Sequence, residues 1–152
     1  MNIFNSRQEA GFWLAEGLQE YRGSKTTTVV AVSEGGMAIA AEIARILNIA
    51  LSTAATAPAK ALPGTANPTL VFVDDNLIES HALATAIQQL TPTHQGTVLV
   101  ATPIATLEAV ADITPLTDGV CCLYLVDNHA EIEPWYTPPH AESAGPTVSP
   151  RT

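Results

Sequence analysis

Apolar, β-branched runs alternate with helical patterns along this chain, and this alternation constrains the fold more than any other feature. The runs are nearly continuous in apolar residues, as in strands buried on both faces. Strands are predicted at Thr27–Val32, Thr69–Val73, Thr97–Ala101 and Gly119–Tyr124. Helices are predicted at Arg7–Tyr21, Met37–Leu47, Glu79–Leu90 and Leu107–Ile113. The order predicts an α/β fold with three layers, a parallel sheet flanked by helices.

The first predicted helix carries signals at both ends. Ser6 followed by Glu9 is a capping-box pattern, and Gly23 is a natural stop. Its apolar face is predicted to hold Ala10, Trp13, Leu14, Leu18 and Tyr21. Between the first two strand–helix units, Ser52 to Pro68 is predicted to form a loop.

The length of 152 residues suits one domain. We expect this domain over residues 1–136. Residues 137–152 contain four prolines among small and polar residues, which predicts a disordered tail.

Composition excludes several classes of function. The net charge is −9, and the six basic residues are scattered singly, so a phosphate-contacting nucleic-acid surface is not expected. No apolar run approaches a membrane span and no secretory signal is visible. Cys121 and Cys122 are adjacent, would point to opposite faces of a strand, and lack the spacing of zinc ligands. We therefore expect a reduced, cytoplasmic protein with neither a disulfide nor a structural zinc site.

Candidate binding residues follow two of the predicted strands. In open parallel sheets, ligands bind at the carboxyl ends of strands. The turn Ser33-Glu34-Gly35-Gly36 follows the first strand, and Asp74-Asp75-Asn76 follows the second.

These turns also carry a family resemblance. The chain from Arg7 to Tyr136 resembles a bacterial type I phosphoribosyltransferase through the order and spacing of several short motifs. The motifs are Arg7-Gln8-Glu9-Ala10-Gly11 with Leu14-Ala15, Glu34-Gly35-Gly36, Val71-Phe72-Val73-Asp74-Asp75, Thr102-Pro103-Ile104 and Trp135-Tyr136. The resemblance implies a Rossmann-like core with a small hood. It also implies transfer of ribose 5-phosphate between phosphoribosyl pyrophosphate (PRPP) and a nitrogenous base, with Mg²⁺ as cofactor.

The resemblance assigns roles to five residues. Asp74 and Asp75 match the acidic pair that contacts the ribose hydroxyls, and Ser80 falls in the following loop that holds the 5-phosphate. Gly35 and Gly36 match the turn that cradles the pyrophosphate. Backbone N–H groups and helix N-termini provide the physical basis for holding such anions.

Three departures from the family pattern oppose this chemistry. Glu79 lies in the segment Asn76 to Ala82, where threonine and glycine are expected around a phosphate. Glu34 stands where the pyrophosphate turn normally carries a basic residue. The hood segment is reduced to 17 residues, Ser52 to Pro68, with Lys60 and Pro63-Gly64 as its remnant. A lid that excludes water is hard to build from so short a segment.

Simpler interpretations stay open beside these roles. Asp74-Asp75 is also typical of a strand end that leads to a helix cap. Glu34 and Glu79 lie near predicted helix N-termini, where the helix dipole favours carboxylates. His81 could form a metal or acid–base pair with the neighbouring acids, although an exposed histidine at a helix start is the simpler interpretation.

Three hypotheses of function follow. The first is a catalytically degenerate phosphoribosyltransferase-like domain that acts as a binding or regulatory protein, with a copy of itself or an active relative as partner. The second is an active phosphoribosyltransferase in which Asp74 and Asp75 recruit Mg²⁺. The third is a sensor of a small molecule or cation, favoured by the acidic turns.

Overall fold

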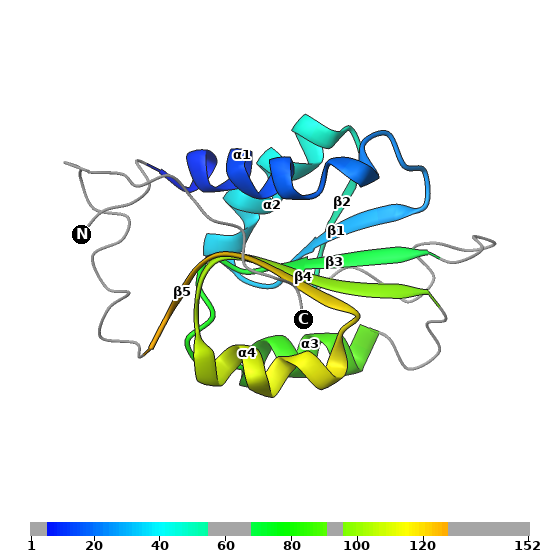
Figure 1. The fold of residues 1–152 in the computed structure, drawn as a ribbon. Coiled ribbons are helices and arrows are strands. Elements are labelled where there is room, and N and C mark those ends of the chain that lie inside the picture. Colours follow the sequence, from blue (N-terminus) through cyan, green and yellow to red (C-terminus); the bar gives the residue numbers. More distant parts are fainter. Residues whose placement is uncertain (1–5, 55–67, 91–95, 128–152) are drawn as a thin grey trace.

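The computed structural model describes residues 6–54, 68–90 and 96–127. A five-stranded parallel sheet in the order β2-β1-β3-β4-β5 lies between two pairs of helices (Figure 1). The strands are β1 (Thr27–Ala31), β2 (Ala50–Thr53), β3 (Thr69–Val73), β4 (Thr97–Thr106) and β5 (Gly119–Val126). The helices are α1 (Arg7–Gly17), α2 (Glu34–Leu47), α3 (His81–Leu90) and α4 (Leu107–Ile113). The predicted three-layer α/β architecture is confirmed.

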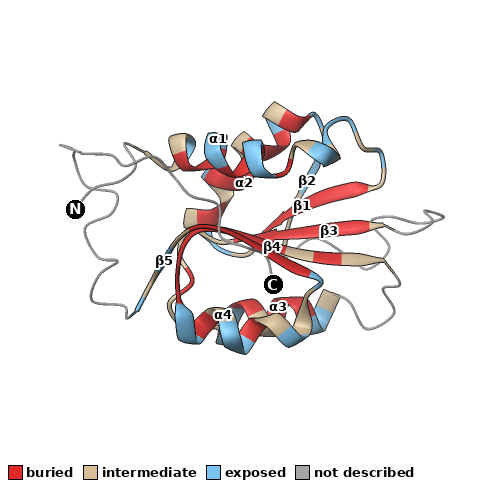
Figure 2. Cartoon of the chain, viewed as in Figure 1, coloured by how far each residue is buried: buried red, intermediate tan, exposed pale blue. Residues whose placement is uncertain are grey.

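Each face of the sheet has its own apolar core. α1 and α2 cover one face, where Val29 and Val71 are buried, and α3 and α4 cover the other, where Val30 and Phe72 are buried. Every residue of β1 and β3 is buried, as Figure 2 shows in red. This double burial explains why these strands are continuous apolar runs rather than alternating patterns.

The two cysteines confirm the expected alternation. Cys121 belongs to the core under α1 and α2, and Cys122 belongs to the core above α3 and α4. Both are buried free thiols. Burial raises the pKa of the Cys122 thiol to about 12, so this group remains protonated and behaves as a small apolar side chain.

One strand was not predicted, and three of the predicted strands end elsewhere: β1 at Ala31, β4 at Thr106 and β5 at Val126. Ala50–Thr53, of which Ser52 and Thr53 were expected in the loop, forms β2, a half-exposed edge strand parallel to β1. β4 continues through Pro103 to Thr106. Its pairing with β3 ends at Ala101, and beyond this point β4 pairs with β5 and, through an isolated bridge at Ala105, with Leu77. Proline is tolerated there because no strand on the other side requires its missing N–H.

The helix ends also differ from the predictions. α2 begins at Glu34 and not Met37, so the glycine turn lies inside its first turn. α3 begins at His81 and not Glu79. At the start of α1 the predicted cap is confirmed, since Ser6 Oγ accepts the N–H of Glu9 at 3.1 Å. α1 ends at Gly17, followed by a 3₁₀ turn over Gln19–Tyr21.

Trp13 does not lie on the buried face of α1, contrary to prediction. Its exposed fraction is 36%, and its ring makes an edge contact with that of Phe12, which is 41% exposed. The buried stripe includes Gly11, where a Cβ would stand 2.8 Å from the Cβ of Glu42 in α2. The buried face of α1 is made of Ala10, Gly11, Leu14 and Ala15, and Trp13 lies outside it.

None of the described helices is long and apolar enough to cross a membrane. The predicted tail, the Trp135-Tyr136 motif and most of the shortened hood segment, including Lys60, lie outside the described residues.

Candidate functional site at the carboxyl ends of β1 and β3

The candidate site lies where the direction of strand addition reverses. From β1 the chain passes to β2 on one side, and β3 then pairs with β1 on the other side. The carboxyl ends of β1 and β3 therefore meet at a topological switch point, the usual ligand crevice of such sheets. A hydrogen bond of 3.0 Å from the N–H of Val32 to the carbonyl of Val73 holds the two strand ends together.

Ser33 connects α2 to the acidic pair. Its Oγ accepts the N–H of Gly36 at 2.9 Å and so caps α2, while its hydroxyl donates to Asp74 Oδ1 at 2.7 Å. The sequence shows the signal for this cap, a serine three residues before Gly36, but the link to Asp74 crosses 41 residues. Ser33 thus positions one of the two candidate carboxylates, a role that the sequence did not reveal.

Gly35 and Gly36 have no room for a side chain. A Cβ at Gly35 would overlap Oδ2 of Asp75, and a Cβ at Gly36 would stand 2.7 Å from the carbonyl oxygen of Val73. The structure therefore brings together four predicted site residues: the two glycines and the acidic pair. The first turn of α2 packs directly onto the end of β3.

Asp75 forms an ion pair with Arg7, the first residue of α1. Both Nη2 and Nε of Arg7 donate to Asp75 Oδ2, at 2.9 and 3.2 Å. The Asp75 side chain is 16% exposed and that of Arg7 is 41% exposed. Sequence reasoning noted Arg7 only within a motif. The 68 residues that separate it from Asp75 leave no local pattern that would reveal the pair.

Asp74 is a partly buried carboxyl group that accepts two hydrogen bonds. Its Oδ1 accepts the Ser33 hydroxyl and also the N–H of Asp75 at 2.8 Å. The pKa of Asp74 is raised to about 6. Burial is the main cause and the adjacent charge of Asp75 adds to it, while the two hydrogen bonds act in the opposite direction. This carboxyl group therefore keeps its proton to a higher pH than an ordinary aspartate does.

Glu79 caps the helix that follows the acidic pair. Its Oε1 accepts the N–H of His81, the first residue of α3, at 3.1 Å. The preceding loop is fixed to β4, because the N–H of Leu77 donates to the carbonyl of Ile104 at 2.9 Å. A carboxylate of the chain itself thus lies at the N-terminus of α3, where the dipole favours negative charge.

Ser80 and Glu34 are not joined to the acidic pair. The Ser80 hydroxyl donates to Asp112 of α4 at 3.4 Å. Glu34 is exposed in the first turn of α2, a favourable position for a carboxylate. His81 is exposed at the start of α3, and within the described ranges no three His, Cys, Asp or Glu side chains are arranged to hold a metal ion.

No protein-family model and no curated protein sequence matches this chain. Solved structures do match. TT1426 from Thermus thermophilus is 19% identical, with a TM-score of 0.69 over 85% of this chain and 87% of that one. A purine phosphoribosyltransferase from Pyrococcus horikoshii is 21% identical, with a TM-score of 0.57 over 90% of this chain and 93% of that one. The chain has a type I phosphoribosyltransferase-like fold.

Proposed function

We propose that this protein is a phosphoribosyltransferase-like binding protein that does not carry out the transfer reaction. The carrying observation is the Glu79 carboxylate, which accepts the N–H of His81 at the N-terminus of α3. The family resemblance assigns the 5-phosphate of PRPP to this loop and helix end. A side-chain anion of the protein thus stands in for the substrate anion.

The acidic pair supports the same conclusion. In an active enzyme these carboxylates would contact the ribose hydroxyls. Here Asp75 accepts two hydrogen bonds from Arg7, and Asp74 accepts one from Ser33. A ribose would have to replace a charge-assisted pair, which is stronger than a neutral hydrogen bond.

Charge at the two helix N-termini opposes binding of PRPP. Glu34 and Glu79 place a carboxylate at α2 and at α3, the two places where anionic groups of the donor would lie. Two like unit charges 4 Å apart repel by about 4 kcal/mol at an effective dielectric constant of about 20. Glu34 and Glu79 are both exposed, so solvent screens each repulsion, and the two together lower rather than cancel the roughly 8 kcal/mol of a micromolar complex.

Mg²⁺, which the resemblance implies for an active enzyme, does not fit the acidic pair in this arrangement. Arg7 already neutralises Asp75, and burial disfavours the charged form of Asp74, which is the form that a cation would bind. An active transferase remains the second candidate because Asp74 and Asp75 keep their place at the carboxyl end of β3. It would require Arg7 to leave Asp75.

Calorimetric titration with PRPP and Mg²⁺ tests the proposal. We expect no heat of binding from the protein, and binding by the purine phosphoribosyltransferase from P. horikoshii as positive control. Micromolar binding by this protein, or release of pyrophosphate with any of a panel of bases, would establish the second candidate instead. Glu79→Ser is expected to increase PRPP affinity, whereas Glu108→Ser, at the start of α4, is the matched control.

The binding role is supported by the aromatic pair of α1. Phe12 and Trp13 are exposed, with ring centroids 5.0 Å apart at an angle of 79°. Large aromatic side chains are enriched in protein interfaces. We propose a second copy of the chain as the partner, since one helix face repeated about a twofold axis brings like aromatic groups together.

A further inference from the structure

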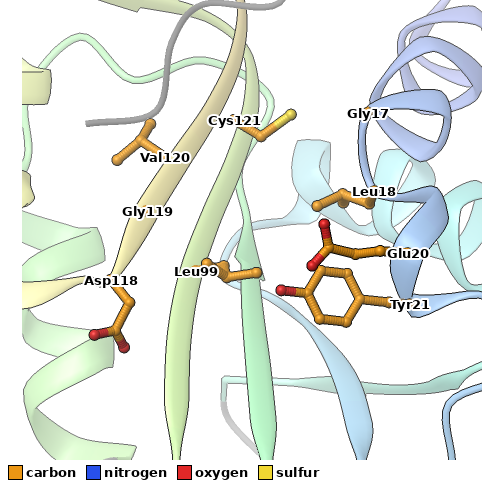
Figure 3. A pocket seen from close by; sticks show the side chains of 9 residues that line it. All are labelled: Gly17, Leu18, Glu20, Tyr21, Leu99, Asp118, Gly119, Val120 and Cys121. Carbon is orange, nitrogen blue, oxygen red and sulfur yellow. The ribbon is translucent and has the colours of Figure 1, made fainter.

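A cavity of about 210 Å³ opens at the opposite end of the sheet from the acidic pair. It lies between the C-terminal end of α1 with its 3₁₀ turn and the amino ends of β4 and β5 (Figure 3). Its lining includes Leu18, Glu20, Tyr21, Leu99, Asp118 and Cys121. Because α1 begins beside Asp75 and runs to this cavity, the two sites lie at opposite ends of one helix.

The walls of the cavity are of two kinds. The side chains of Leu18, Leu99 and Cys121 form an apolar part. Figure 3 shows the Glu20 carboxylate and the Tyr21 hydroxyl directed into the space between α1 and β4. An apolar wall with a few polar groups at one side is the usual composition of a small-molecule site.

Glu20 supplies the charge that this cavity offers to a ligand. The other lining carboxylate, Asp118, accepts the N–H of Val98 at 2.8 Å and lies across β4 from Glu20 in Figure 3. Among the described residues, no Lys, Arg or His lines the cavity. Within the described parts of the chain, no side chain pairs with the Glu20 carboxylate.

We propose that this cavity binds an alkylammonium group. A carboxylate beside an aromatic ring attracts an ammonium ion by charge and by the ring quadrupole, and the apolar wall accommodates the alkyl chain. A cavity of about 150 Å³ can hold a benzene-sized molecule, whereas drug-sized ligands need roughly 300 Å³ or more. The ligand is therefore a short aliphatic amine or the side chain of a lysine.

NMR titration distinguishes these two sources. The probes are n-butylammonium chloride for a free amine and N-acetyl-lysine-methylamide for a lysine of a partner protein. The readout is the backbone amide shifts of Gly17 and Gly119, which both line the cavity. Tighter binding of butylammonium identifies a free amine as the ligand, and tighter binding of the lysine amide identifies a protein partner.

Two variants and a neutral probe complete the test. Glu20→Gln keeps the shape and removes the charge, and we expect it to weaken binding about tenfold, the effect of losing one charge-assisted hydrogen bond. Glu16→Gln, exposed one turn earlier and outside the cavity, is the matched control and should bind as the wild type does. The proposal is overturned if neither amine shifts these amides, if n-butanol binds equally well, or if Glu20→Gln binds unchanged.

Discussion

Replacing Asp74 by Asn should stabilise the protein at alkaline pH and have little effect at acidic pH. Burial raises the pKa of Asp74 from 3.8 to about 6 in the folded state. A raised pKa means that the folded protein binds this proton more tightly than the unfolded chain. The resulting stabilisation is fully present below about pH 3.8 and is lost as the pH rises through about 6.

The size of this effect follows from the shift itself. About two pKa units correspond to roughly 3 kcal/mol, since one unit is about 1.4 kcal/mol. Above about pH 7 the wild type therefore holds a carboxylate that folding disfavours by this amount. The Asp74→Asn variant cannot ionise, and its amide oxygen can still accept the Ser33 hydroxyl. We expect its advantage over the wild type to grow by about 2–3 kcal/mol between about pH 4 and pH 8.

Urea unfolding of both proteins across this range measures the difference. Carboxylates distant from Asp74 titrate equally in both proteins and cancel in the comparison, so the difference reports the acidic pair of Asp74 and Asp75. Asp112→Asn, in the exposed part of α4, is the matched control and should show no comparable change with pH. If the free-energy difference between Asp74→Asn and the wild type is the same at every pH, burial of Asp74 does not carry the cost that we assign to it.

Two further predictions concern α1. Arg7→Met should lower the free energy of unfolding by about 1–2 kcal/mol at neutral pH, because it leaves the mostly buried Asp75 carboxylate without the Arg7 cation. Arg45→Met, which removes an exposed pair with Glu42, should cost clearly less, since solvent screens that pair. Equal effects of the two substitutions on urea unfolding would contradict the assignment. Trp13→Ser should shift sedimentation velocity from dimer to monomer with the fold retained by circular dichroism, and a monomeric wild type at all concentrations would refute self-association.

The sequence predicted where the buried strands lie, but it predicted neither the edge strand β2 nor the end of β4. β3 and α4 have the predicted bounds, because each is a strong local pattern with a clear breaker on both sides. β2 was missed because an edge strand is half exposed and lacks a continuous apolar run. β4 was ended too early at Pro103, since a proline breaks a strand only where a neighbour needs its N–H, and this depends on pairing.

The candidate site divides in the same way. The Gly35-Gly36 turn and the acidic pair of Asp74 and Asp75 were predictable, because parallel strands place their carboxyl ends at one edge of the sheet. The role of Arg7 was not predictable, because its partner Asp75 lies far along the chain and the pair leaves no pattern in the local spacing of residues. Glu79 was expected to repel a phosphate. Its carboxylate also accepts the N–H of His81, so this N–H at the start of α3 already has an acceptor within the chain.

The Arg7–Asp75 pair couples anchoring of the first helix to occupation of the crevice. A cation or hydroxyl-bearing molecule that takes Oδ2 of Asp75 competes with the guanidinium at the first turn of α1. Phe12 and Trp13 lie less than two turns further along that helix, and Glu20 lies beyond its end. A partner that binds α1 and favours its docked position therefore weakens binding of a ligand at Oδ2 of Asp75. By thermodynamic linkage, that ligand weakens binding of the partner by the same factor. One side chain thus makes the two ends of the molecule compete.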